Sequence, residues 1–375
     1  MEYVALKDVC KINMGQSPDS SSYNDKKEGI PFYQGNADFG EKHPIPRVWC
    51  NAPTKIAQPK DILMSVRAPI GALNYAQEKC CIGRGLAAIT PDKDKLSLEF
   101  LYWFLRGKNS ELNSKGTGST FKAISKKTLE EVRVPLIDLE KQQKMAQALE
   151  KTYSVIQMRT KQLKELDDLI KARFVELFGD LRTNTKEWKI QAFSELTDLI
   201  TDGEHATPRR TTNGIYLLSA RNILNHAIQL DDVDYIDQEE YDRIAKRVVP
   251  QAGDVLISCS GTVGRCCTVP VGLKFQMVRS AALLRFKPEI NPKFAEYMIT
   301  SEYLQEQINR LKTASSQANL FQGKIAKLKG FAPPMELQQE FNAFVAVIDK
   351  SKATVQKALD ETQLLFDSLM QQYFG

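Results

Sequence analysis

The sequence has no long hydrophobic run, and no stretch approaches the about 18 consecutive apolar residues typical of a transmembrane helix. The N-terminus lacks a basic region followed by an apolar core, so we expect no secretory signal. Histidine is scarce, with three residues, and the seven cysteines are odd in number and form no Cys-x-x-Cys pair. These absences argue against a disulfide framework and against a zinc site. We interpret the cysteines as reduced core residues of a cytoplasmic protein.

The composition is that of a folded protein with more than one domain. A length of 375 residues predicts two or three domains, and 42% apolar with 26% charged residues is ordinary for globular chains. The net charge of +5 is compatible with a polyanionic partner but is too small to establish one.

The chain contains an internal repeat. Four blocks recur in the same order at offsets of 193 to 196 residues: 61–71 at 254–264, 84–89 at 279–284, 98–104 at 292–298 and 135–179 at 331–375. Two copies are too few for a solenoid, so each half should have its own core. The sequence therefore predicts two similar domains.

Each copy begins with short β-type runs, such as 62–66 and 255–259, which are separated by Gly/Pro/Asn/Ser loops and followed by an amphipathic helix. A proline-bearing hinge ends each mixed region. We therefore predict an α+β fold in which two similar mixed α/β globular domains alternate with two long helices. The expected segments are 1–134, 135–179, 180–334 and 335–375.

Each long helix should carry a heptad seam. Beyond each hinge about 40 residues contain neither Gly nor Pro, and apolar positions step by 4 and 3 from Met145 to Leu177 and from Phe341 to Tyr373. The first helix leads from one domain to the other and the second starts at the second domain, so we predict an antiparallel coiled coil. At 1.5 Å per residue it would be a spacer of roughly 60 Å. The alternative is that each helix packs separately on its own domain.

No catalytic constellation is evident. Residues 116–122 faintly resemble a phosphate-binding loop but lack the glycine before the lysine, and Gly83-Arg84-Gly85 is an isolated Gly-x-Gly. His205 has acidic neighbours that could orient it as a base, but the first copy has no histidine at the corresponding place. We predict that the chain alone is not an enzyme and holds no metal or cofactor.

Polar loops at equivalent places in the two copies could contact DNA. Arginine can donate two hydrogen bonds to guanine, Asn and Gln pair with adenine, and Lys or Arg hold phosphates. In the first half the candidates are Gln34, Asn36, Arg67, Lys79, Arg84, Lys115 and Lys122. In the second half they are Arg209, Arg210, Arg221, Asn222, Arg265, Arg279, Gln317 and Asn319. Because the loops differ between the copies, two half-sites in duplex DNA should differ in sequence.

The order of these motifs resembles the specificity (S) subunits of type I DNA restriction–modification enzymes over essentially the whole chain. The matching segments are 29–36, 61–71, 82–89, 202–208 and 253–258, with the helix starts Leu139-Glu140-Lys141-Gln142 and Met335-Glu336-Leu337-Gln338. One departure is that Lys122 stands where the second half has Asn319, in a loop that the family tends to keep rich in Ser, Gln and Asn.

The resemblance implies that each domain recognises one half of a bipartite target and that the helices act as a ruler. It also implies that the helices help to hold two modification (methyltransferase) subunits, which carry S-adenosylmethionine and methylate adenine. Restriction subunits would add ATP- and Mg-dependent translocation and cleavage. The alternatives are a tandem scaffold that binds proteins without DNA specificity, and a self-sufficient nuclease or methyltransferase.

Overall fold

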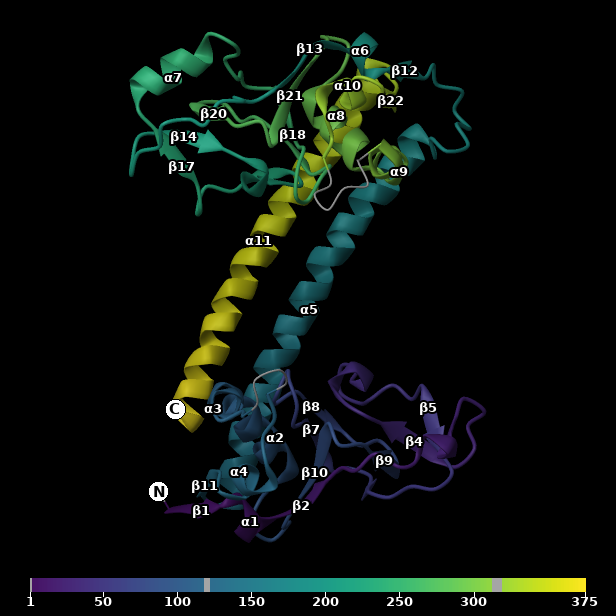
Figure 1. The fold of residues 1–375 in the computed structure, drawn as a ribbon, viewed down its shortest axis with the longest axis vertical. Coiled ribbons are helices and arrows are strands. Elements are labelled where there is room, and N and C mark those ends of the chain that lie inside the picture. Colours follow the sequence, from purple (N-terminus) through teal and green to yellow (C-terminus); the bar gives the residue numbers. More distant parts are fainter. Residues whose placement is uncertain (1, 118–121, 312–318) are drawn as a thin grey trace. The chain divides into compact units, whose positions relative to one another are not determined.

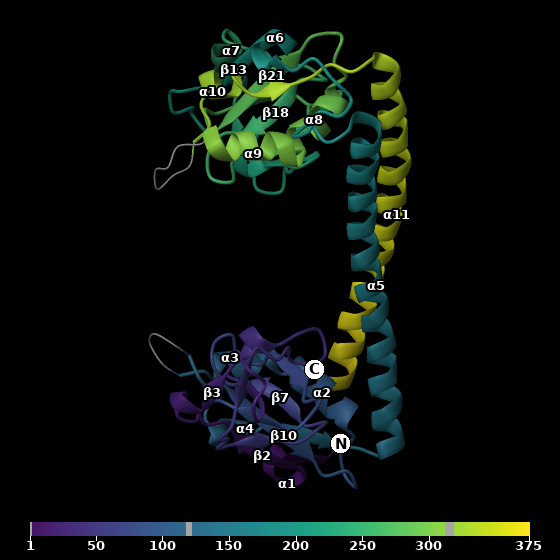
Figure 2. The same ribbon diagram turned by 90° about the vertical axis from the view of Figure 1, so that its right-hand side faces the viewer.

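The computed structural model describes residues 2–117, 122–311 and 319–375. The chain divides into two compact units (Figure 1 and Figure 2). Unit 1 comprises Met1–Thr160 and Gln356–Gly375, and unit 2 comprises Lys161–Val355. Each unit therefore contains one globular domain and part of both long helices.

The globular domain of unit 1 is built on two sheets. The four-stranded antiparallel sheet has the order β2 (Cys10–Met14), β10 (Leu86–Pro91), β7 (Ile62–Ser65), β8 (Leu73–Tyr75). The five-stranded sheet has the order β3 (Tyr23–Asn24), β5 (Val48–Cys50), β4 (Ile30–Tyr33), β9 (Cys80–Ile82), β6 (Ile56–Ala57). The remaining strands are the antiparallel pair β1 (Glu2–Ala5) and β11 (Arg133–Leu136). The helices are α1 (Leu6–Val9), η1 (Ser20–Ser22), η2 (Asn36–Asp38), α2 (Leu98–Gly107), α3 (Asn109–Ser114) and α4 (Lys126–Glu130).

The globular domain of unit 2 uses the same plan. Its four-stranded sheet has the order β13 (Thr197–Asp202), β21 (Ala281–Phe286), β18 (Val255–Ser258), β19 (Cys266–Thr268). A three-stranded sheet has the order β17 (Asp234–Ile236), β14 (Ile215–Leu218), β20 (Phe275–Met277). Two short pairs are β12 (Gln191–Ala192) with β22 (Lys329–Gly330), and β15 (Ile223–Leu224) with β16 (Ala227–Ile228). The helices are α6 (Phe193–Leu196), η3 (Ala220–Asn222), α7 (Gln238–Ala245), α8 (Pro292–Thr300), α9 (Glu302–Leu311) and α10 (Gln322–Ile325).

The two domains share one topology, which confirms the predicted repeat. The four-stranded sheets follow the same order, and the parallel pair β4–β9 corresponds to the parallel pair β14–β20. The registers also correspond, because Tyr33 pairs with Ile82 in the first copy and Leu218 pairs with Met277 in the second. The main difference is α7, which takes the place in the chain that β6 has in the first copy.

The predicted long helices are α5 (Leu139–Phe178) and α11 (Met335–Phe374), of 40 residues each. The first begins four residues later than the predicted segment 135–179, because Pro135 and Leu136 belong to β11. Every predicted seam position is buried or partly buried, as the heptad pattern requires.

The contacts within each unit show that the two helices are antiparallel. In unit 1 the ring of Tyr153 lies 5.8 Å from that of Phe366, and Arg159 donates to the Thr362 hydroxyl at 2.9 Å. In unit 2 Lys352 pairs with Asp167, and Arg173 pairs with Glu340. In each unit, as the residue number rises along α5, the number of the contacted residue on α11 falls, which is the pattern of an antiparallel pair. The alternative, that the two helices pack separately on their own domains, is therefore wrong.

Each helix ends in a core of aromatic rings. At the end of α11, Phe374 makes edge contacts with Phe100 and Phe104 of α2, at 5.4 and 5.7 Å. At the end of α5, Phe178 makes the same kind of contact with Phe294 of α8, at 4.8 Å, in unit 2. A helix that begins at one domain therefore completes the core of the unit that holds the other copy. This packing explains why phenylalanine recurs at 178 and 374.

The repeated Glu-x-Gln sequence at the start of each helix has a structural cause. The side chain of Gln142 is fully buried, donates to the carbonyls of Lys95 and Ile137, and accepts from the Ser97 amide. Gln338 forms the equivalent three bonds in unit 2. Because buried backbone groups need partners, this glutamine fixes the start of each long helix to its domain.

Candidate nucleic-acid interface

In unit 1 three loops converge on a polar pocket of about 220 Å³. The loops follow β4, β7 and β9, and the residues that line the pocket are Gln34, Gly35, Asn36, Arg67, Ala68, Arg84 and Gly85. Four of these, Gln34, Asn36, Arg67 and Arg84, were predicted from the sequence to contact DNA. The fold thus brings together at one place side chains that lie up to 50 residues apart in the chain.

Close backbone packing holds two of these loops together. A Cβ atom on Gly85 would lie 2.3 Å from the carbonyl oxygen of Gln34, so only glycine fits there. The turn of η2 is fixed by Asp38, whose carboxylate accepts from the amides of Gln34 and Gly35, at 2.7 and 3.3 Å. The loop that presents Gln34 is therefore held in place before any ligand binds.

The two arginines of this pocket are free to meet an anion. Arg67 and Arg84 are both exposed, and neither forms an ion pair with any residue that the structure describes. An unpaired guanidinium can bind a phosphate or the edge of a guanine.

In unit 2 the corresponding region is a pocket of about 380 Å³. The residues that line it are Glu204, His205, Ala206, Thr207, Pro208, Arg210, Val278, Arg279 and Ser280. Of the predicted DNA contacts, Arg210 and Arg279 line it. The registers of β4–β9 and β14–β20 make Arg279 the counterpart of Arg84. Both pockets therefore present an arginine at the same place of the repeat.

The remainder of the second pocket differs in chemistry from the first. Ser260 is the counterpart of Arg67, because it follows β18 as Arg67 follows β7, and it is not among the lining residues. A histidine takes part instead: His205 Nε2 lies 2.9 Å from Asp202 Oδ2, and Arg247 also pairs with Asp202. From the sequence, His205 was a candidate only for a catalytic base. Its place in the 202–208 motif was the sequence signal that could have placed it among the residues of the pocket.

Several predicted arginines of unit 2 are paired with carboxylates. Arg210 Nε lies 3.0 Å from Asp234, and Arg221 lies 3.1 Å from the same carboxylate. Arg209 pairs with Asp237 at 3.0 Å and with Glu239 at 2.8 Å. In unit 1 the comparable pairing is that of Lys115 with Glu111, at 2.6 Å.

The remaining predicted residues lie outside the lining of both pockets. These are Lys79, Lys115, Lys122, Arg209, Arg221, Asn222, Arg265 and Asn319. Gln317 lies outside the described residues. Their contact with DNA stays a prediction, except for Asn222.

The assignment of Asn222 as a DNA contact is wrong in this conformation. Its side chain is 1% exposed, donates to the carbonyls of Gln229 and Asp232, and accepts from the Ser219 amide. By accepting a backbone amide it fixes the turn of η3, as Asp38 fixes the turn of η2. A buried amide with its hydrogen bonds satisfied within the fold has nothing left for a base.

The predicted correspondence of Lys122 with Asn319 is also wrong, by one residue. The Ile124 amide donates to the Val66 carbonyl. The Leu320 amide donates to the equivalent carbonyl of Cys259. The residues that precede these two amides, Ala123 and Asn319, are therefore the true counterparts.

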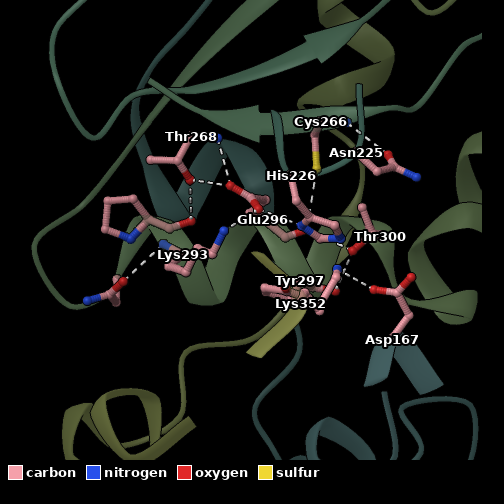
Figure 3. A network of polar contacts seen from close by, with 12 residues as sticks. Asp167, Asn225, His226, Cys266, Thr268, Lys293, Glu296, Tyr297, Thr300 and Lys352 are labelled. Atoms are coloured by element: carbon pink, nitrogen blue, oxygen red, sulfur yellow. Dashed lines mark hydrogen bonds and ion pairs between the residues drawn. The ribbon is translucent and has the colours of Figure 1, made fainter. Parts of the chain in front are cut away.

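A buried ionic cluster lies elsewhere in unit 2 (Figure 3). The carboxylate of Glu296 on α8 is 1% exposed and pairs with His226 and Lys293, the latter at 2.9 Å. It also accepts from the amide and hydroxyl of Thr268, at 2.7 and 2.6 Å. Burial raises the pKa of Glu296, but the hydrogen bond and charge of His226, the charge of Lys293 and the Thr268 hydroxyl outweigh it and lower the pKa to about 2.

The repeat shows that this cluster is structural. In the first copy the places of Thr268 and Glu296 are taken by Tyr75 and Tyr102, whose rings stack at 4.7 Å. The same position of the fold thus holds a charged and a polar side chain in unit 2 and two aromatic rings in unit 1. In the described part of the chain, no group of three or more His, Cys, Asp or Glu residues could hold a metal ion.

Taken together, the duplicated α+β domain, the arginine-bearing loop pocket of each copy and the paired helices define a class of tandem recognition proteins. A family model described as the type I restriction modification DNA specificity domain matches residues 1–168 and 186–362. The chain therefore belongs to the family of type I restriction modification DNA specificity domains.

Individual relatives agree with this assignment. The chain is 43% identical over 177 residues to the putative type I restriction enzyme MjaX specificity subunit of Methanocaldococcus jannaschii; the match covers 47% of this chain and 41% of that protein. It is 21% identical to the EcoBI specificity subunit of Escherichia coli, over 99% of this chain and 85% of that one. The match to the first relative thus spans less than half of that protein.

A solved structure supports the fold. The crystal structure of the S subunit of a type I restriction–modification system from M. genitalium superposes with a TM-score of 0.62 at 14% identity, over 100% of this chain and 96% of that one.

Within residues 2–117, 122–311 and 319–375, none of the helices combines the length and apolar character that crossing a membrane requires.

Proposed function

We propose that this chain recognises a bipartite, asymmetric target in duplex DNA, with one globular domain for each half-site. The observation that carries the proposal is the recurrence of an exposed arginine, Arg84 and Arg279, in a loop pocket at the same place of both domains. Different neighbours surround the shared arginine, so the two pockets offer different donors and acceptors to the bases. The recognition domains would be 1–134 and 180–334.

The long helices fit the role of spacer between the half-sites. Each has 40 residues, which corresponds to about 60 Å of helix. We propose that 135–179 and 335–375 fix the number of unread base pairs in the gap. Insertion of one heptad into both helices should then lengthen the gap without changing either half-site, and an unchanged gap would remove the basis for the ruler.

The helices also expose apolar side chains that suit protein partners. These are Met158, Leu169, Val175, Val347, Leu364 and Leu365. Leu169 and Leu365 occupy the same position of the repeat and are 47% and 53% exposed, one in each unit. We propose that two modification subunits pack here. Those subunits would bring S-adenosylmethionine for adenine methylation, and restriction subunits would bring ATP- and Mg-dependent cleavage.

A tandem protein-binding scaffold without DNA specificity is not supported, because the matching family is described as a DNA specificity domain and the relatives are named specificity subunits of type I restriction enzymes.

The proposed DNA recognition is tested by methylome sequencing of cells with and without this chain. We expect a bipartite adenine-methylated motif that depends on the chain. Replacement of residues 1–134 by the domain of a relative should change one half of that motif and leave the other intact; a change in both halves would contradict the division of labour.

A further inference from the structure

Asp234 joins the two arginine-bearing loops of the second domain. One of its carboxylate oxygens lies 3.0 Å from Nε of Arg210, and the other lies 3.1 Å from Arg221. Arg210 lines the pocket, and Arg221 lies in η3. One carboxylate thus forms a bridge between two cations that come from different loops.

The backbone fixes the position of this carboxylate. Asp234 begins β17 and stands opposite Leu217 in the antiparallel pair with β14. The loop that carries Arg210 is tied to the same strand, because the Thr211 amide donates to the Tyr235 carbonyl at 2.9 Å. Both ends of the Arg210 contact are therefore anchored on β17.

The first copy shows that the fold does not need an acid at this position. Phe32 corresponds to Leu217, and Val48 stands opposite Phe32 in the pair of β4 with β5. Val48 is thus the counterpart of Asp234. In the first pocket Arg67 and Arg84 form no ion pair with described residues. The carboxylate is a feature of the second recognition site and is not required by the sheet.

We infer that Asp234 is a specificity-determining residue of the second domain, which holds Arg210 and Arg221 in place and neutralises them against non-specific phosphates. The inference rests on the proposed DNA-recognition function. Free arginines bind any duplex through phosphates, and each such contact releases counterions. A paired arginine gains less from a random phosphate, because the contact must break or share an existing ion pair. Only a site that offers matching base edges would then recover full binding.

Asp234→Asn tests this with a near-isosteric change. It should make the salt dependence of binding to a random-sequence duplex pool steeper by about 1 in log–log slope, since Arg210 loses its carboxylate partner and each freed cation adds about 0.9. Arg221 keeps a second carboxylate, Asp232, at 3.5 Å. Affinity for that pool should rise about three- to tenfold at 0.1 M salt. Affinity for the duplex selected by the wild-type chain should rise less, so that the ratio of specific to random binding falls.

Two further variants make the result decisive. Asp231→Asn removes the same charge three residues away, where no ion pair with a described residue is broken, and it should leave the slope within error of wild type. Asp234→Val installs the side chain that the first copy carries and should reproduce the effect of Asp234→Asn.

The outcomes separate the two proposals. Suppose that the wild-type chain binds duplex DNA. If Asp234→Asn then shows the same salt slope as Asp231→Asn, or if Asp234→Asn binds the random pool more weakly than wild type, the inference is overturned while the proposed function stands. If the wild-type chain with its methyltransferase partner binds no duplex, both fall.

Discussion

Replacement of Glu296 by Gln removes the charge at the centre of the buried cluster in unit 2. In the folded protein the pKa of this carboxyl is about 2, against an ordinary value of 4.5. A difference of about 2.5 pKa units at 1.36 kcal/mol each corresponds to about 3 kcal/mol of folding stability. Because the folded pKa is the lower one, this stability is fully present above about pH 4.5 and is lost as the pH falls towards 2.

The assay follows urea unfolding of unit 2 by hydrogen exchange in peptides from α8 and β19, which contain Glu296 and Thr268. At pH 7, Glu296→Gln should be less stable than wild type by about 3 kcal/mol. The difference should shrink steadily below about pH 4.5.

Glu289→Gln is the matched control, since Glu289 is exposed in the same domain and its carboxylate has no ion pair among the described residues. Its stability should follow that of wild type at every pH. Equal stability of Glu296→Gln and wild type at pH 7, or a difference that does not change with pH, would refute the electrostatic account of the cluster.

The other predictions concern the pockets and the helix starts. Gly85→Ala should force its new methyl group against the Gln34 carbonyl, cost about 1–3 kcal/mol of stability and weaken DNA binding. In Gly35→Ala, in the same pocket, the methyl group meets no atom within 4 Å, so this variant should bind DNA normally. Calorimetry checks the stability of both variants, and a gel-shift assay checks their DNA binding. Gln338→Ala removes three buried hydrogen bonds and should cost about 2–3 kcal/mol in urea titration; a loss below about 0.5 kcal/mol would contradict its role. Arg84→Ala should flatten the salt slope of DNA binding by about 1 if the side chain holds a phosphate, and an unchanged slope would exclude that contact.

The repeat and the long helices were predictable because their signals are local or periodic. The seam from Met145 to Leu177 follows from spacing alone, and the recurrence of Phe178 as Phe374 marks the helix ends. The gathering of Gln34, Arg67 and Arg84 at one pocket was predictable only as a list of polar loop residues. Their meeting depends on the pairing of β4 with β9 in one sheet and on the packing of these strands against β7 of the other sheet, where Tyr33, Ile82 and Leu63 share a core cluster.

The sequence alone could not predict which polar side chains pair with one another in the fold. Arg210 and Arg221 were predicted as DNA contacts with no partner named within the chain. Their shared carboxylate partner comes from β17, whose register with β14 cannot be read from composition. Asn222 appeared as an exposed amide because nothing local shows that η3 buries it. The one-residue error between Lys122 and Asn319 arose because loop alignment by residue type does not see the backbone hydrogen bonds that set the true correspondence.

The central claim is that two copies of one recognition domain bind two different short sequences at a fixed separation. Selection from a random duplex library by the full chain with its methyltransferase partner, followed by sequencing of the bound DNA, tests it directly. The account predicts enrichment of two unlike short elements with a constant gap between them. A single contiguous element, two elements at variable distance, or no enrichment would contradict it.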